Sequence, residues 1–204
     1  STASDMVPRP AFLRYYNRML QHRFIDSAIR NPEKIAFIDR SLGRNVSYSQ
    51  ALLASLILAR RFRKMERGRI GIMLPTSSAG GIAIIAALMA DRTPVMINYS
   101  TGAEKNCLYA QEQCDFQVIV TAKALLEKAG CKQLPNMVFI EDMLGALGKS
   151  EKLLAFIKSK LPLSLLKRAA GRSNLDSPAV ILFTSGSEKE PKVVQLTQHN
   201  ILSN

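Results

Sequence analysis

The sequence predicts an α/β protein built on a doubly wound, mostly parallel sheet that is flanked by helices. Short apolar segments alternate with helical segments between residues 70 and 140, and such alternation is typical of parallel strands joined by right-handed crossovers. The apolar segments carry no polar face, which suits strands that are covered on both sides. Of the 204 residues, 47% are hydrophobic and 22% are charged, values that favour a folded domain over a disordered chain.

A helix and a hairpin are expected first along the chain. Apolar residues at helical spacing predict a helix over 12–29, and the pair Asn31-Pro32 ends it. Residues 34–39 alternate as a strand does, and residues 45–47 return the chain after a turn. The sequence therefore indicates a small antiparallel hairpin ahead of the main sheet.

A second helix follows a capping box. The hydroxyl of Ser47 is spaced to accept a hydrogen bond from the backbone three residues later, where Gln50 can return one. We expect this helix to stop at Gly68. Five residues are expected on its apolar side: Leu52, Leu53, Leu56, Ile57 and Ala59.

Strand and helix segments then alternate toward the end of the chain. The expected strands cover 70–74, 94–97, 116–120, 137–140, 179–183 and 193–196. The expected helices between them cover 78–89, 104–113 and 122–129. Thr197 is placed to cap one more helix that begins near His199.

The net charge of +12 admits three classes of partner: nucleic acid, an anionic membrane surface and an acidic protein. Six cations cluster at the expected carboxyl-terminal end of the second helix: Arg60, Arg61, Arg63, Lys64, Arg67 and Arg69. Cations at this place complement the helix dipole, and no aromatic platform or recognised nucleic-acid motif accompanies them. We therefore favour a structural role for the cluster and expect no nucleic-acid partner.

Residues 142–172 form a basic amphipathic stretch that admits two interpretations. It can lie on an anionic membrane, or it can form a surface helix pair that docks on the sheet, which we favour. No run of about 18 uncharged apolar residues predicts a spanning helix. Residues 1–10 lack the pattern of a secretory signal, so a cytoplasmic protein is expected.

Metal sites and disulfides are not expected. Cys107, Cys114 and Cys131 are odd in number and show no CxxC spacing, which argues against a disulfide framework and against a zinc site. His22 and His199 cannot form a metal site at their spacing without other ligands, and neither is given a ligand role.

A polar loop between two apolar strands, within residues 183–192, is the candidate binding site. Thr184, Ser185 and Ser187 offer hydroxyl donors, and Gly186 allows a ligand to approach the backbone closely. Successive backbone N–H groups in such a turn can surround an anion, and Lys192 adds a positive charge. The loop lacks the Walker and Rossmann patterns. Its composition alone favours phosphate binding and an ordinary polar hairpin loop equally.

The order of residues in this loop resembles a known motif. The run FTSGSE, followed two residues later by PK, resembles the phosphate-binding loop of the adenylate-forming (AMP-binding) superfamily. The stretches FIDRSLGRNVSYSQALLASLILAR and RIGIMLPTSSAGGIAIIAALMADRTPVMINYS resemble the opening hairpin and the first large crossover of that superfamily. The resemblance covers about 24–204, with Lys189 and Val193 at positions where glycine is usual.

A closer resemblance is to one subgroup, the acyl-ACP synthetase part of bacterial 2-acylglycerophosphoethanolamine acyltransferase/acyl-ACP synthetases. The segments that carry it are PVMINYSTGAEKN, LPNMVFIEDM and ILFTSGSE. This resemblance implies that residues 1–204 are the amino-terminal part of an adenylation domain and are inactive alone. It also implies an enzyme of the cytoplasm with a peripheral association to the inner membrane surface.

The resemblance further implies ATP-dependent activation of a fatty acid. The carboxylate attacks the α-phosphate of ATP, with Mg²⁺ on the phosphates, and the thiol of acyl carrier protein then displaces AMP. The residues implied in nucleotide binding are Thr184, Ser185, Gly186, Ser187, Glu188, Lys189 and Lys192. Lys192 would neutralise the leaving pyrophosphate and is the candidate catalytic residue. Two alternatives stay open: a fatty acid–CoA ligase, and a non-catalytic basic domain that binds a membrane or a partner.

Overall fold

The computed structural model describes residues 19–40, 43–145, 148, 153, 156–157, 159–171, 174–184 and 191–203. Its helices are α2 (Leu20–Arg30), α3 (Tyr48–Phe62), α4 (Ser78–Met89), α5 (Ala103–Cys114), α6 (Lys123–Ala129), α7 (Ile140–Gly145), α9 (Leu163–Ala169) and α10 (Gln198–Leu202). Its strands are β1 (Ile35–Asp39), β2 (Arg44–Ser47), β3 (Gly68–Ile72), β4 (Arg92–Met96), β5 (Ile119–Thr121), β6 (Met137–Phe139), β7 (Pro178–Thr184) and β8 (Lys192–Thr197).

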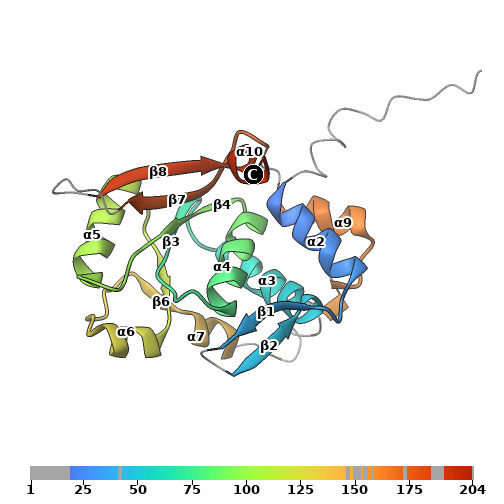
Figure 1. Ribbon diagram of the computed structural model, residues 1–204, viewed down its shortest axis with the longest axis horizontal. Coiled ribbons are helices and arrows are strands. Elements are labelled where there is room, and N and C mark those ends of the chain that lie inside the picture. Colours follow the sequence, from blue (N-terminus) through green and yellow to red (C-terminus); the bar gives the residue numbers. More distant parts are fainter. Residues whose placement is uncertain are drawn as a thin grey trace, which may run out of the picture.

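The described strands form an antiparallel pair, β1 with β2, and a six-stranded sheet of order β6-β5-β3-β4-β7-β8 (Figure 1). Neighbouring strands from β6 to β7 are parallel, and β8 returns antiparallel to β7. The chain builds outward from β3 in both directions, which places crossover helices on both faces of the sheet. The prediction of a doubly wound, mostly parallel sheet flanked by helices is confirmed.

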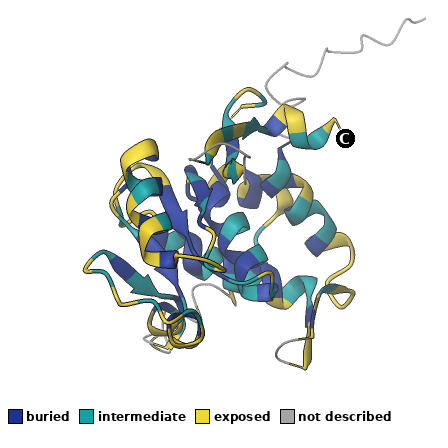
Figure 2. Cartoon of the chain, turned by 60° about the vertical axis from the view of Figure 1, so that its left-hand side comes forward, coloured by how far each residue is buried: buried dark blue, intermediate teal, exposed yellow. Residues whose placement is uncertain are grey.

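The sheet separates two apolar clusters. Ile70 and Ile72 of β3 belong to one cluster, together with residues of α3 and α4. Met73, next along the chain, belongs to the other cluster, together with residues of α5 and α6. Successive side chains of an extended segment point to opposite sides, so the clusters fill the two faces of the sheet. Figure 2 shows the central strands of the sheet in dark blue, between helices whose outer faces are yellow.

The buried side of α3 differs from the expected one. The capping box of Ser47 and Gln50 is present, but the helix ends at Phe62, before Gly68. Its buried residues are Ala51, Leu52, Ser55, Leu58, Ala59 and Phe62. The expected Leu53, Leu56 and Ile57 are only partly buried. Because α3 is apolar on more than one side, spacing alone did not select the face that packs against α4.

Asp39 ties the small hairpin to the first crossover helix. Its carboxylate is buried, and Oδ2 accepts hydrogen bonds from the backbone N–H of Ser78 at 3.1 Å and from its hydroxyl at 2.6 Å. Ser77 caps the same helix by accepting a bond from the N–H of Gly80. A carboxylate is favourable at a helix N-terminus, so a protein group already occupies the positive end of α4.

The basic stretch 142–172 contributes α9, which packs against α2. The ammonium of Lys167 lies 2.7 Å from the carboxylate of Asp26, and His22 Nε2 lies 3.0 Å from the carbonyl oxygen of Lys167. Leu166 is buried. The docked interpretation therefore holds for α9, but its contact is helix α2 and not the sheet that was expected. No helix in the described part of the chain is long and apolar enough to cross a membrane.

Two arginines of the predicted basic cluster close the carboxyl-terminal ends of helices. Arg63 donates hydrogen bonds to the carbonyls of Met89 at 2.5 Å and of Ala169 at 2.6 Å, where α4 and α9 end. Arg69 donates to the carbonyl of Cys114 at 2.9 Å, where α5 ends. The last carbonyls of a helix lack partners within it. A structural role is therefore present at these two positions, but the helix ends that they close are those of α4, α9 and α5 and not the end of α3 that was expected.

Candidate functional site

The polar loop at 183–192 joins β7 to β8. The two strands pair until Thr184 and Lys192 lie opposite each other. Thr184 Oγ1 is 3.5 Å from the carbonyl oxygen of Lys192, at the long limit of a hydrogen bond, and Lys192 is exposed. The other predicted residues lie outside the described residues: Ser185, Gly186, Ser187, Glu188 and Lys189. The structure thus positions the base of the loop.

The loop leaves the sheet at its carboxyl edge. β7 is parallel to β4, with Ile181 opposite Val95, so the end of β7 lies on the same side as the ends of the other parallel strands. Open α/β sheets bind their ligands at this edge, beyond the carboxyl ends of the strands. The position of the loop therefore suits a ligand site independently of its composition.

Tyr109 of α5 contacts both ends of the loop. Its hydroxyl donates a 2.8 Å hydrogen bond to the carbonyl oxygen of Pro191, one residue before β8. Its ring packs edge-on against the ring of Phe183 in β7, with centroids 6.0 Å apart. The bond joins residues 82 positions apart in the sequence. No local pattern could have indicated it, because it depends on the order of the strands.

The turn before α5 is held by side-chain hydrogen bonds. Asn98 Oδ1 accepts from the N–H of Ser100 at 2.9 Å and from its hydroxyl at 2.7 Å. Asn106 Nδ2 donates to the carbonyls of Asn98 and Thr101 at 2.9 and 2.8 Å. Gly102 then begins the helix with a φ of 63°. These bonds fix the start of α5 at the carboxyl edge and so help to place Tyr109.

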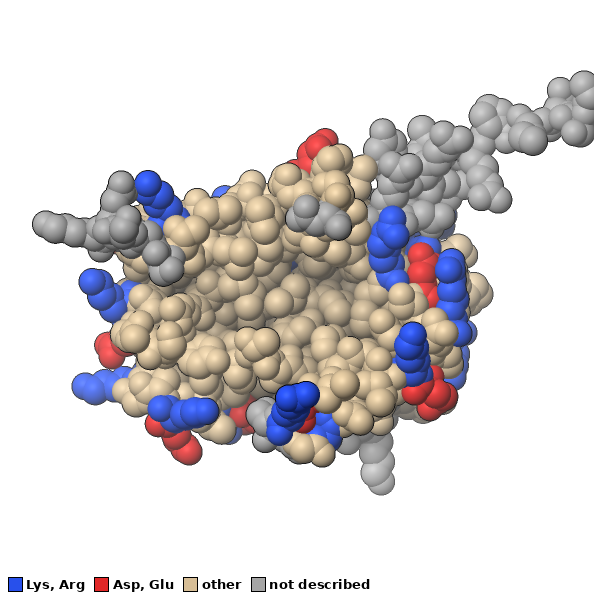
Figure 3. Space-filling view, viewed as in Figure 1, with Lys and Arg blue, Asp and Glu red and all other residues tan. Residues whose placement is uncertain are grey.

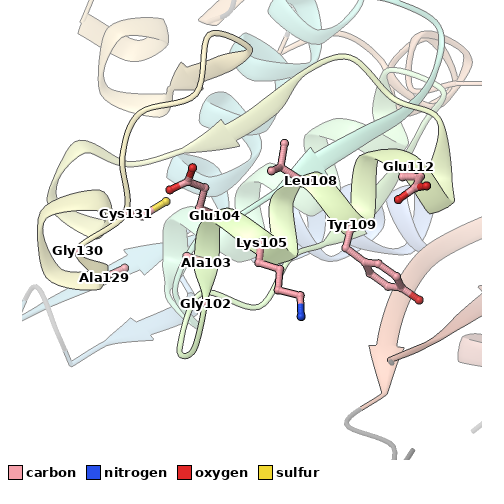
Figure 4. A pocket seen from close by; sticks show the side chains of 10 residues that line it. All are labelled: Gly102, Ala103, Glu104, Lys105, Leu108, Tyr109, Glu112, Ala129, Gly130 and Cys131. Atoms are coloured by element: carbon pink, nitrogen blue, oxygen red, sulfur yellow. The ribbon is translucent and has the colours of Figure 1, made fainter. Parts of the chain in front are cut away.

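A hollow of about 680 Å³ lies between α5 and α6 (Figure 4). Its lining includes Glu104, Lys105, Glu112 and Cys131. Burial and the nearby Glu104 raise the pKa of the Cys131 thiol, so this cysteine is not activated as a nucleophile. The hollow mixes both signs of charge without a convergent set of polar groups, and we assign it no ligand.

Charged side chains do not gather on the face shown in Figure 3. The middle of that face is uncharged, and lysines and arginines stand around its margin. Among the described residues, no group of three or more His, Cys, Asp or Glu side chains could hold a metal ion. The ring of His22 contacts the backbone of α9 through the carbonyl oxygen of Lys167.

The chain matches the family model described as AMP-binding enzyme over residues 24–204. Its fold is also similar to solved structures. The N-terminal subdomain of NpsA from Klebsiella oxytoca has 16% sequence identity and a TM-score of 0.67, over 91% of this chain and 43% of that one. O-succinylbenzoate Coenzyme A synthetase (MenE) from Bacillus subtilis, solved with AMP, has 17% identity and a TM-score of 0.62, over 85% and 41%.

A nonribosomal peptide synthetase, FmoA3, solved with AMPPNP, has 16% identity and a TM-score of 0.67, over 91% of this chain and 18% of that one. The chain therefore spans less than half the length of each of these three structures. At such identities the likeness shows a common fold alone.

Proposed function

The chain belongs to the AMP-binding enzyme family, and we propose that it supplies the phosphate-binding part of an acyl-activating enzyme. The observation that carries the proposal is the place of the 183–192 loop. It leaves the carboxyl edge of the sheet beside the exposed Lys192 and lies inside the family match. Hydroxyls, a glycine and a lysine at this edge suit the phosphates of a nucleotide.

In the proposed reaction a carboxylate attacks the α-phosphate of ATP and pyrophosphate leaves. The attack of an anion on a polyanion requires cations and oriented donors around the phosphoryl oxygens. Backbone N–H groups and hydroxyls of Thr184, Ser185 and Ser187 would bind these oxygens, and Lys192 would neutralise the leaving pyrophosphate. Gly186 would leave room for the phosphates, and Glu188 and Lys189 complete the loop. Mg²⁺, which prefers oxygen ligands, would neutralise phosphate charge when bound with ATP.

The proposed acyl substrate is a fatty acid, and the proposed acceptor is the thiol of acyl carrier protein. Sequence resemblance to acyl-ACP synthetases supports this choice. The net charge of +12 also suits an acidic protein partner, because opposite charges steer association. A fatty acid–CoA ligase is the second candidate. Comparing the rates of the whole protein with acyl carrier protein and with CoA separates the two, and a preference for CoA would reject the first.

Pyrophosphate exchange tests the adenylation step. The whole natural protein that contains this chain should incorporate labelled pyrophosphate into ATP when a fatty acid is present. Replacing Lys192 by glutamine should lower kcat/KM about 100-fold, the usual effect of removing one preorganised charge-stabilising group. Lys132→Gln is the matched control, because Lys132 is an exposed lysine after α6 and its loss should leave exchange unchanged. Exchange that survives Lys192→Gln would refute the assignment.

We also propose contact with an anionic membrane surface. Ahead of the docked helix α9, the basic stretch exposes three apolar side chains between 51% and 58% of their area: Leu153, Phe156 and Ile157. Apolar groups among lysines are typical of helices that lie in a membrane interface. The protein should sediment with vesicles that contain anionic phospholipid, and Phe156→Glu should weaken this. Equal binding to zwitterionic vesicles, or no effect of the substitution, would contradict the proposal.

A further inference from the structure

We propose that Tyr109 is the positioning residue of the phosphate loop: its hydroxyl fixes the peptide group that precedes Lys192, and its ring fixes the strand end that precedes Thr184. The inference rests on the proposed function, since it assigns to Tyr109 the control of a loop that binds ATP. Tyr109 itself is not proposed to touch the nucleotide. Figure 4 shows its side chain extending from α5 toward the strands that carry the loop.

The hydrogen bond from the hydroxyl of Tyr109 holds the backbone directly before Lys192. The carbonyl of Pro191 belongs to the peptide bond between Pro191 and Lys192, so a donor on this oxygen fixes the plane from which Lys192 continues. Proline has no N–H and cannot be held by a ladder hydrogen bond through its own nitrogen. The 2.8 Å bond from Tyr109 supplies an anchor from outside the hairpin. Without this hydrogen bond, the peptide plane before Lys192 should vary more in orientation, and so should the direction of the Lys192 side chain.

The ring of Tyr109 packs against β7, the strand that leads into the loop. It meets Phe183 edge-on at a centroid distance of 6.0 Å, in an arrangement that aromatic pairs favour. One side chain on α5 thus contacts the residue before Thr184 and the residue before Lys192. Because β8 is the last strand of the described sheet order, its start is held from one side by β7, and α5 provides the second support.

The hydroxyl and the ring can be tested separately. Tyr109→Phe removes the bond to Pro191 and keeps the ring against Phe183, whereas Tyr109→Leu removes both. Tyr48→Phe is the matched control, because Tyr48 lies at the start of α3 and packs on Phe24. Pyrophosphate exchange would be measured for the whole protein at varied ATP and varied fatty acid. Hydrogen exchange of a peptide that covers 184–192 would be measured on the same variants.

If a smaller fraction of the protein holds a binding-competent loop, the apparent affinity for ATP falls by that fraction. Tyr109→Phe should therefore raise the KM for ATP about 2- to 10-fold, the range expected for one neutral hydrogen bond. The KM for the fatty acid should stay unchanged, and hydrogen exchange over 184–192 should accelerate. Tyr109→Leu should show the larger effect on both readouts, and Tyr48→Phe should show neither.

The outcomes separate this inference from the proposed function. Wild-type protein without pyrophosphate exchange would overturn both. Active wild-type protein whose Tyr109→Phe variant keeps the same KM for ATP would overturn the role of Tyr109 alone. A variant that loses thermal stability while its KM for ATP and its loop exchange stay unchanged would show that Tyr109 only packs, which also overturns the inference.

Discussion

Lys167 offers a direct test of how the basic stretch docks. Its ammonium is 2.7 Å from the carboxylate of Asp26 on α2, and the two side chains are only 9% and 18% exposed. A lysine that lay on a membrane would instead keep its charge in the interface. We predict that Lys167→Met destabilises the folded chain, because it leaves the carboxylate of Asp26 in a poorly hydrated place without its cation.

The size of the effect follows from the exposure of the pair. Removing one member of a buried ion pair costs about 3–5 kcal/mol. Asp26 retains 18% of its exposure and hence some hydration, so we expect the lower end, about 3 kcal/mol. For a chain of this length that corresponds to a fall in Tm of roughly 6–12 °C. Replacing both charges, as Lys167→Met with Asp26→Asn, should recover at least half of the loss, since no charge is then left unpaired.

Thermal and urea melting of the three variants would measure these differences. Lys160→Met is the matched control: Lys160 is an exposed lysine of the same stretch that lies over the ring of Phe156 at 5.5 Å, and its loss should cost less than about 1 kcal/mol. Equal, small effects of Lys167→Met and Lys160→Met would refute the reasoning. So would a double variant that is as unstable as the sum of its single substitutions.

Two further predictions concern the core and the thiols. Gly71→Ala places a methyl group 2.6 Å from the ring of Phe116 and should cost about 1–3 kcal/mol in urea unfolding, whereas Gly145→Ala meets no atom within 4 Å and should cost nothing. Equal stability of the two variants would contradict this. In the folded protein a disulfide reagent should modify Cys131 before Cys107, because burial raises the pKa of Cys107 to about 12. The pKa of Cys131 is raised as well, so its labelling rate should still be climbing above pH 9, and a plateau below that pH would count against the assignment.

Elements with local start and stop signals could be predicted closely. The helix expected over 78–89 coincides with α4, because Ser77 caps its start and Asp91, with a φ of 55°, ends the chain's helical path. The strand expected over 116–120 is instead β5 at 119–121. Phe116 lies before the strand but is buried, because its ring packs where Gly71 has no side chain. A buried aromatic residue beside a strand has the same sequence pattern as a residue within the strand, so the predicted start was too early.

Part of the candidate site could also be predicted from the sequence, and part of it could not. The composition and order of the residues predicted the polar loop and the two strands that flank it. The predicted capping of α10 by Thr197 is confirmed. The contact of Tyr109 with the loop could not be predicted from the sequence. Its helix follows β4 in the sequence, yet it reaches the β7–β8 hairpin because β7 pairs with β4 and not with β6. A contact created by strand order has no local signature.

The direction in which the helices run explains part of the positive charge of the chain. Crossover helices run antiparallel to their strands, so their carbonyl ends gather at the amino edge of the sheet, opposite the 183–192 loop. Arg63, Arg69 and Arg92 stand at that edge, and Arg92 donates to the carbonyl of Met65 at 3.1 Å, just beyond α3. Desolvation lowers the pKa of Arg63 and Arg92, a cost that their carbonyl partners offset. Part of the excess charge therefore holds helix ends together, and only the rest can steer an acidic partner. The argument for ATP depends on the few residues at the opposite edge, where Lys192 is exposed.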